Sequence, residues 1–449
     1  MANDINLVKT TKRNAWLWVP TLYFAEGIPY FIVNNISVMM FTNLGVPNGQ
    51  MAFFTSLIYL PWVLKCFWSP FVDVIKTKRW WILSMQLLMT AAFILLAVTL
   101  PHPDEATIAA KSTNINLFIT TLVIFFVTAF ASATHDIAAD GFYMIALPQS
   151  QQSAFVGIRS TFYRIASVFG QGVLVFIAGL LEKRGDVPAA WVWTLIITAI
   201  IFGAIALYHT FYAVPKCADD KPNVQNVEGE SSAVAIFKGF GKSFATYFTK
   251  PLVWLGIAFM LLYRLPEAFL IKMIMPFLRD AQTLGGLGLP TETIGLAYGT
   301  VGVIALLAGG IIGGIMISRL GLKKSLWPMA ACMILPCLTF CYLSMVQPTN
   351  IILIIIAIAI EQFGYGFGFT AYMLFMMYLS EGEFKTSHYA ICTAFMALSM
   401  MVPGMFAGYL QEAVGYTPFF WIVVACGIAT VLVTLLVIRK VDPSYGCKK

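Results

Sequence analysis

The chain has 449 residues, of which 59% are hydrophobic and 11% are charged, whereas soluble domains are about 45–50% apolar and about 25% charged. The mean hydropathy of +0.81 describes the whole length, so a soluble fold is excluded and a lipid environment is expected. The net charge of +7 is not gathered into basic runs, so no nucleic-acid partner is expected.

Twelve apolar stretches are long enough to cross a bilayer, which takes about 20 mainly apolar residues in a helix. The first six lie at residues 15–41, 51–72, 80–100, 116–147, 152–181 and 190–214. The second six lie at residues 252–279, 291–318, 325–346, 350–379, 386–412 and 417–439. We therefore predict an all-α membrane protein with twelve transmembrane helices in two pseudo-symmetric six-helix bundles.

One long polar connection, residues 215–250, separates the two sets of helices. The prediction is thus an N-terminal half at residues 1–214, a cytoplasmic linker at 215–250 and a C-terminal half at 251–449. Within the linker, residues 233–249 have the composition of a helix that lies on a membrane surface.

Lysine and arginine residues outside the apolar stretches favour one side of the membrane. Only Lys111, Lys183, Arg184 and Arg279 fall on one side. Nineteen fall on the other, at residues 9–13, 76–79, 216–250, 319–324, 385 and 439–449. Because positive loops stay in the cytoplasm, both termini are predicted to be cytoplasmic.

A short pattern recurs in the loop after the second helix and in the loop after the eighth. Residues 69–79 align without a gap with residues 314–324: a small residue, a polar residue four positions later (Asp73 or Ser318), and a closing basic pair. The pattern resembles the loop motif of the major facilitator superfamily, whose two six-helix repeats bind substrate near the midplane. Asp73 and Arg319 are therefore expected to control conformational gating. The alternative, that these loops only set orientation, explains their charge but not their matched spacing.

Ten ionisable residues lie inside the apolar stretches, where each costs at least about 2.5 kcal/mol and is a functional candidate. Five are acids and five are bases, which suggests internal pairing. They are Glu26, Asp136, Asp140, Glu267 and Glu361, with Lys65, Arg159, Arg164, Arg264 and Lys272.

The fourth and fifth helices are predicted to form a ladder of charges. Counting residues from the loop between them places Asp136 level with Arg164, and Asp140 level with Arg159. Asp136 and Asp140 also share one helix face. Either these pairs lock two helices together, or the carboxylates exchange a proton during transport. Asp136 and Asp140 are our candidates for proton coupling; His135 lies on another face, which makes a relay role the weaker option.

Acids also interrupt the first and seventh helices, which occupy equivalent places in the two halves. Glu26 lies close to Pro29, and Glu267 follows a proline and Arg264. Interrupted helices at corresponding positions point to a transport site. Glu26, which has no base in its own segment, is a further candidate for proton coupling. Glu267, Arg264 and Tyr30 are candidates for substrate binding.

The tenth helix carries Glu361 followed by alternating glycines and aromatics through residue 370. Glycines let other groups approach the backbone. The aromatics either stack on sugar rings or pack in the core. Glu361 and Tyr365 are predicted to contact substrate.

A narrower resemblance covers the chain from the first helix to the last. The chain resembles the AmpG-type muropeptide permeases, a family related to the acetyl-coenzyme A transporters. The resemblance rests on residues 60–73, 131–140, 163–164 and 263–269, and on Glu361 with its glycines. The positions that match the family's motifs are Lys65, Asp73, Asp136, Asp140, Arg164 and Glu361.

The resemblance implies proton-driven import of GlcNAc-anhydromuropeptides through a bacterial inner membrane, for cell-wall recycling. Lys65 and Arg159 are added to the gating residues, and Arg164 to the substrate-binding residues. Glu26 departs from the family pattern, where a small residue is usual, and His135 stands where an amide is usual. These departures keep open an altered coupling or a different cargo.

Other functions remain open at this point. One alternative is a transporter whose cargo is another acidic or acyl solute, including acetyl-coenzyme A-like or siderophore-like molecules. A membrane-embedded acyltransferase would need a catalytic grouping, and none emerges, so the chain is not expected to be an enzyme. A sensor or drug exporter is disfavoured because Gly170-Gln171-Gly172 replaces the Gly-Pro pattern of antiporters.

Without a metal-binding spacing of Cys and His, we expect no metal or cofactor. The expected partners are a small-molecule substrate, protons and lipid, and the expected state is a monomer.

Overall fold

The computed structural model describes residues 14–147, 149–216, 232–382 and 384–446. All regular secondary structure in these residues is helical. The N-terminal half contains α1 (Val19–Phe31), α2 (Ser37–Asn43), α3 (Asn48–Leu57), α4 (Leu60–Val74), α5 (Lys78–Thr99), α6 (Glu105–Ala109), α7 (Ile119–Ala146), α8 (Gln149–Ser167), α9 (Val175–Glu182) and α10 (Val187–Tyr208). After these come α11 (Ser232–Phe248), α12 (Val253–Leu262), α13 (Leu265–Arg279), α14 (Thr291–Ile294), α15 (Val303–Ile334), α16 (Leu338–Val346), α17 (Ile351–Ser380), α18 (Lys385–Val414) and α19 (Tyr416–Ile438).

These elements join end to end into membrane-length rods. Ten helical runs in the described residues are long and apolar enough to cross a membrane. The longest, Thr291–Val346, has 56 residues and reverses at Gly321, whose φ of +78° a residue with a side chain rarely adopts. It therefore supplies two spans, and the run from α1 to α2 supplies one more, which confirms the predicted twelve.

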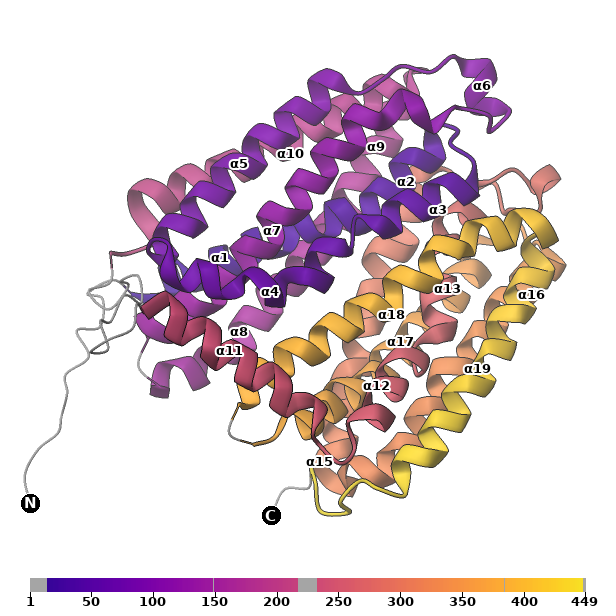
Figure 1. Cartoon of the computed structure of the whole chain (residues 1–449). Helices are drawn as coiled ribbons and strands as arrows, with labels where there is room; N and C mark the ends of the chain where they lie inside the picture. The colour runs from indigo at the N-terminus through magenta and orange to yellow at the C-terminus, as the bar shows by residue number, and fades with distance from the viewer. Residues whose placement is uncertain (1–13, 148, 217–231, 383, 447–449) are drawn as a thin grey trace, which may run out of the picture.

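The two halves pack as two bundles side by side (Figure 1). Helix α11 lies across one end of the molecule and contacts both halves: it packs on α4 and α18, with Phe244 beside Phe67. The short α6 lies at the opposite end. The helix expected within the linker is thus present, and these two elements define the α11 end and the α6 end of the molecule.

Glycine allows unusually close packing in two places. In the C-terminal half, a Cβ on Gly366 of α17 would collide with the Leu306 carbonyl of α15. Between the halves, the π-helical turn Val168–Leu174 packs on the π-helical turn Gly295–Gly302. A Cβ on Gly172 would lie 3.1 Å from the Gly299 carbonyl oxygen, so this contact is one of backbone on backbone.

Candidate functional site

A cavity of about 540 Å³ lies between the two halves. Both halves contribute helices to its wall, and its lining mixes aromatic, charged and small polar side chains. The N-terminal half supplies Tyr23, Glu26, Tyr30, Tyr59, Trp62, Lys65, Asp136, Asp140, Arg159, Tyr163 and Arg164 among others. The C-terminal half supplies Arg264, Tyr298, Gln362, Tyr365, Phe369, Tyr389 and Thr393 among others. Mostly apolar lining with a few convergent polar groups is typical of ligand sites.

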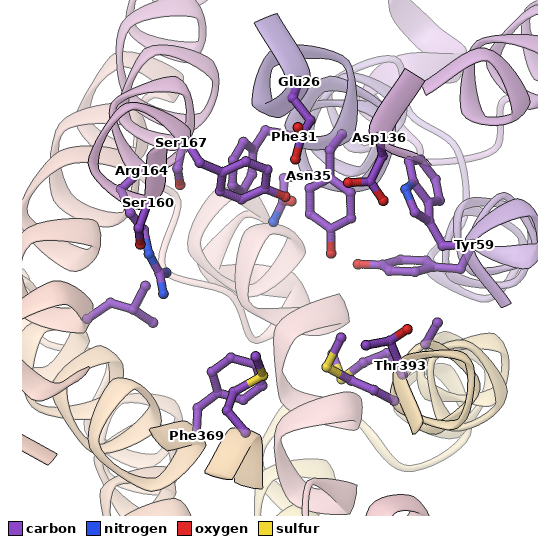
Figure 2. A pocket seen from close by; sticks show the side chains of 18 of the residues that line it. Glu26, Phe31, Asn35, Tyr59, Asp136, Ser160, Arg164, Ser167, Phe369 and Thr393 are labelled. Atoms are coloured by element: carbon purple, nitrogen blue, oxygen red, sulfur yellow. The ribbon is translucent and has the colours of Figure 1, made fainter. Parts of the chain in front are cut away.

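The carboxylate of Asp136 on α7 has two partners. The Lys65 ammonium on α4 donates to it at 2.6 Å. On the other side lies the carboxyl group of Glu26 on α1, which interacts with it, and Figure 2 shows both acids beside the cavity. Two neighbouring carboxyl groups favour a proton on one of them, because two adjacent negative charges repel each other. A proton bound here lies next to an ammonium group.

One helical turn further along α7, Asp140 forms the ion pair that the sequence predicted. Arg159 of α8 donates to its carboxylate at 2.5 Å, and the Tyr23 hydroxyl donates at 3.0 Å. The Arg159 guanidinium also covers the rings of Tyr23 and Tyr143, at 4.4 and 5.1 Å from the ring centres. Three helices, α1, α7 and α8, are tied together at this point.

The predicted pairing of Asp136 with Arg164 is wrong. Lys65 takes that place, while Arg164 and Asp136 extend into the cavity from separate sides (Figure 2). Matching depths along two helices ignores rotation about the helix axis. Arg159 and Arg164 are five residues apart, which turns them about 140° from each other on α8, so they cannot both face the same stripe of α7.

Counting charges shows what this acid cluster can do. Glu26, Asp136 and Asp140 are three carboxyl groups, and Lys65 and Arg159 are the two basic groups that contact them. One bound proton makes the set neutral, and its loss leaves one negative charge in a weakly polar setting. Such an imbalance is costly, which gives the cluster a reason to hold a single exchangeable proton.

Arg264 is the corresponding cation on the C-terminal side of the cavity. Its guanidinium donates to the Tyr365 hydroxyl at 2.6 Å and lies 4.6 Å from the centre of the Phe369 ring. The sequence left open whether the aromatics after Glu361 stack on sugars or pack in the core. Tyr365 and Phe369 line the cavity, whereas Phe363 and Phe367 stack on each other.

Glu267 and Glu361 do not line the cavity. Their carboxyl groups interact with each other, and the two residues are only 1% and 2% exposed. Gln362, which does line the cavity, donates to Glu361 at 2.8 Å. Direct substrate contact by these two acids was predicted, but this geometry places them behind the wall instead. Tyr30, also predicted to bind substrate, does line the cavity, with its ring edge-on to Trp62.

His135 points away from the cavity, as its helix face implied. Its Nε2 lies 3.0 Å from the Gln86 amide nitrogen, and the Gln86 amide oxygen lies 3.0 Å from Nδ1 of His209. His209 continues to the hydroxyl of Thr21 at 2.9 Å. This buried polar chain joins α5, α7 and the end of the sixth span to α1.

The remaining gating candidates lie near the α11 end. Asp73 belongs to α4, but its side chain falls outside the described part of the structure. Arg319 is exposed two residues before the bend at Gly321. Their gating roles stay predictions.

At the α6 end, polar contacts close the gap between the halves. Lys111, beyond α6, donates at 2.6 Å both to Asp280, which follows α13, and to Asn48 of α3. Burial lowers the pKa of Lys111, against the effect of Asp280. The hydroxyl of Tyr416 donates to Asp280 at 2.6 Å, and Glu412 accepts from the backbone of α3. Sequence reasoning missed this cluster, because no local signal relates loops in different halves.

Lys272 is a second feature that the sequence did not interpret beyond its position in a span. It lies on α13 at the interface of the halves and is 3% exposed. Its ammonium donates to the Thr55 hydroxyl at 3.3 Å and lies 5.1 Å from the centre of the Tyr59 ring. Tyr59 separates it from the cavity, so Lys272 lies between the cavity and the closed α6 end.

Comparisons with known proteins place the fold. The D-xylose-proton symporter superposes with a TM-score of 0.69 at 13% identity, covering 96% of this chain and 98% of that one. The nucleoside transporter NupG superposes with a TM-score of 0.68 at 14% identity, covering 96% of this chain and all of the other. At these identities the likeness concerns the fold alone.

Sequence comparison gives the family. The anhydromuropeptide permease of Escherichia coli (strain K12) is 25% identical over 435 residues, which are 93% of this chain and 78% of that protein. The family model of the Major Facilitator Superfamily matches residues 21–387. The expected membership is confirmed: this membrane transporter belongs to the Major Facilitator Superfamily.

Proposed function

We propose that the protein is a proton-coupled importer of anhydromuropeptides or related amino-sugar and peptide fragments of the cell wall, acting in a bacterial inner membrane. The observation that carries the proposal is the acid cluster of Glu26, Asp136 and Asp140, which lies on the wall of a cavity between the two halves. Such a cluster combines an exchangeable proton with a solute site.

Charge outside the membrane supports a direction. If the α6 end, with only four basic residues, faces the periplasm, both termini lie in the cytoplasm. The contacts of Lys111 and Asn48 then close the outer side, and the cavity belongs to an inward-facing or occluded state. Opening toward the periplasm requires those contacts to break.

The proton has a defined task in this proposal. Protonation of Asp136 from the periplasm weakens its ion pair with Lys65 and frees α4 from α7. Loss of that proton toward the cytoplasm restores the pair. Asp140 with Arg159 still links α7 to α8, so the cluster changes shape without coming apart.

The cavity chemistry suits an acidic sugar-peptide. Arg164 and Arg264 approach it from the two halves, and arginine binds carboxylates through paired hydrogen bonds. Tyr30, Trp62 and Tyr365 offer aromatic faces to sugar rings. The name of the 25% identical relative, a permease for anhydromuropeptides, supports this class of cargo.

The same arginines would accept other acidic solutes, including acyl-coenzyme A-like and siderophore-like molecules, so these stay as alternatives. An acyltransferase is less well supported. The described residues that line the cavity include serines and carboxylates but neither His nor Cys, so no nucleophile has a base of the usual kind.

Transport in liposomes tests the proposal. The purified protein is reconstituted, an inward proton gradient is imposed, and labelled anhydromuropeptide, GlcNAc disaccharide or acetyl-coenzyme A is added outside. We expect gradient-driven accumulation of anhydromuropeptide above the other two. Uptake that is indifferent to the gradient would remove proton coupling, and preferred uptake of another solute would replace the cargo.

A further inference from the structure

The carboxyl pair in the C-terminal half has no role in the function proposed above. Glu267 extends from α13 and Glu361 from α17, and the two carboxyl groups interact with each other behind the cavity wall. Both residues are almost fully buried, and one oxygen of Glu267 has no hydrogen-bond partner among the described residues.

Two buried acids that interact this closely favour a bound proton. A protonated carboxyl group can donate a hydrogen bond to its neighbour, whereas two carboxylates have no hydrogen to donate. Two negative charges in contact inside a weakly polar interior would repel each other strongly. The pair is therefore best described as two carboxyl groups that share one proton.

The groups that face the pair fix its charge. They are Arg264, which directly precedes α13, Tyr298 of the π-helical turn in the eighth span, Tyr365 of α17, and Cys337, which directly precedes α16. Only Arg264 is cationic, and its guanidinium donates to Tyr365. With one shared proton the pair carries a single negative charge, which Arg264 balances. A second proton, or none, would leave a net charge in the interior.

A short route joins the pair to the cavity. Gln362 lines the cavity, donates to Glu361 at 2.8 Å, and lies 3.3 Å from the hydroxyl of Tyr298, which also lines the cavity. A change in the Gln362 rotamer is enough to bring cavity water to Glu361. The proton is thus shielded from the cavity by one side chain.

The arrangement repeats that of the N-terminal half. There, the carboxyl groups of Glu26 in the first span and Asp136 in the fourth interact with each other. Here, Glu267 of the seventh span and Glu361 of the tenth do the same. In a fold of two six-helix repeats, the first and seventh spans are equivalent, as are the fourth and tenth. Each half therefore holds one carboxyl pair between equivalent spans, but at different depths: Asp136 lies 17 residues after the start of α7 at Ile119, and Glu361 lies 10 residues after the start of α17 at Ile351.

We propose that Glu267 and Glu361 form a second proton-binding site, which exchanges its shared proton with cavity water past Gln362, so that two protons move with each substrate. This inference rests on the proton-coupled function proposed above. Only a proton is transferred: it leaves the carboxyl pair for water, and the pair is protonated again on the next cycle.

Two measurements test the site, on the full-length protein in lipid. Infrared spectroscopy detects the carbonyl stretch of a protonated carboxyl group. Glu361→Gln and Glu267→Gln should each remove one such band at neutral pH, and Glu105→Gln, an exposed acid of α6, should not. Uptake assays at clamped membrane potential then measure how the accumulation of anhydromuropeptide depends on the pH gradient. Glu361→Gln should lower the accumulation ratio about tenfold per pH unit, because one proton fewer is coupled.

The outcomes separate the two proposals. A band that survives both substitutions shows that no proton is shared and overturns the inference. If the band is lost but the accumulation ratio still depends on the pH gradient as in the wild type, the proton is structural and is not transported. That result also overturns the inference. Both results require wild-type uptake that follows the gradient; if that uptake ignores the gradient, it is the proposed function that fails.

Discussion

The two halves hold their buried acids in different surroundings. In the N-terminal half, Asp136 meets Lys65 and Glu26 on the cavity wall. In the C-terminal half, the equivalent pair lies behind Gln362 with no base within ion-pairing distance among the described residues. Equivalent spans thus carry an open, charge-balanced cluster in one half and, at another depth, a closed pair in the other.

One position explains much of this difference. The repeated loop pattern aligns residue 69 with residue 314, which sets Lys65 opposite Gly310. Lys65 brings a cation to the cavity and keeps the wall polar. Gly310 has no side chain, and its carbonyl accepts from Thr370 of α17 at 3.3 Å, so α15 and α17 pack closely and cover the acids. Changing one lysine to glycine, or the reverse, alters both charge and access.

The largest effect is expected from Asp136→Asn. If the N-terminal cluster is where the proton drives transport, gradient-driven uptake should fall to background while substrate exchange continues, because an amide cannot release a proton. Flux assays in liposomes measure both. Lys65, whose side chain is 23% exposed, would lose its ion-pair partner, so Lys65→Met with Asp136→Asn is the matched control for stability. Driven uptake by the folded single variant would contradict the assignment.

The next comparison sets the two cavity arginines against each other. Arg264→Gln should raise KM for anhydromuropeptide about 10- to 100-fold, since a hydrogen bond to a charged group is worth about 1.5–3 kcal/mol. Arg164→Gln provides the same change on the N-terminal side, and a neutral GlcNAc disaccharide is the control solute. Equal losses for the charged and the neutral solute would mean that Arg264 supports structure and does not recognise a carboxylate.

A smaller effect is expected at the α6 end, where ion pairs of unequal burial join the halves. Lys111 is buried against Asp280, whereas the side chain of Lys183, paired with Glu292, is 62% exposed. Lys111→Met should favour opening there and raise maleimide labelling of a cysteine placed at Thr55 by about 5- to 30-fold, as 1–2 kcal/mol implies. Lys183→Met should change it less than about twofold, as surface pairs are weak. Similar labelling in both variants would show that burial does not strengthen this contact.

The smallest effect on transport is expected for the buried histidine chain, which has no counterpart on the cavity wall. Gln86→Leu removes the hydrogen bonds to His135 and His209 and should cost about 1–3 kcal/mol of stability. The midpoint of thermal unfolding in detergent should fall, while the coupling of uptake to the pH gradient stays within about twofold. Lost coupling in the folded variant would give His135 the relay role that its position disfavours.

The fold was predictable because lipid imposes a simple rule on the sequence. Twelve apolar stretches, a polar linker and a repeated loop identify the spans without knowledge of their packing. The pair Asp140–Arg159 was predictable too, since both residues lie at one depth in a helical hairpin. The rotation of each helix about its axis was not predictable. That rotation places Lys65, and not Arg164, beside Asp136. Contacts between distant loops, such as Lys111 with Asp280, depend on how the halves sit together, which no local pattern encodes.

The glycine contact between the π-helical turns Val168–Leu174 and Gly295–Gly302 has a mechanical consequence. Backbone atoms make most of this contact, with the Thr300 side chain beside Gly172, so one turn can shift against the other with few changes of side-chain rotamer. The helices on either side of the contact lead to the α6 end and the α11 end. A rotation of the halves about this contact that widens one end narrows the other. A single methyl group, as in Gly299→Ala, would meet the Gln171 backbone and slow every transport cycle, whichever solute occupies the cavity.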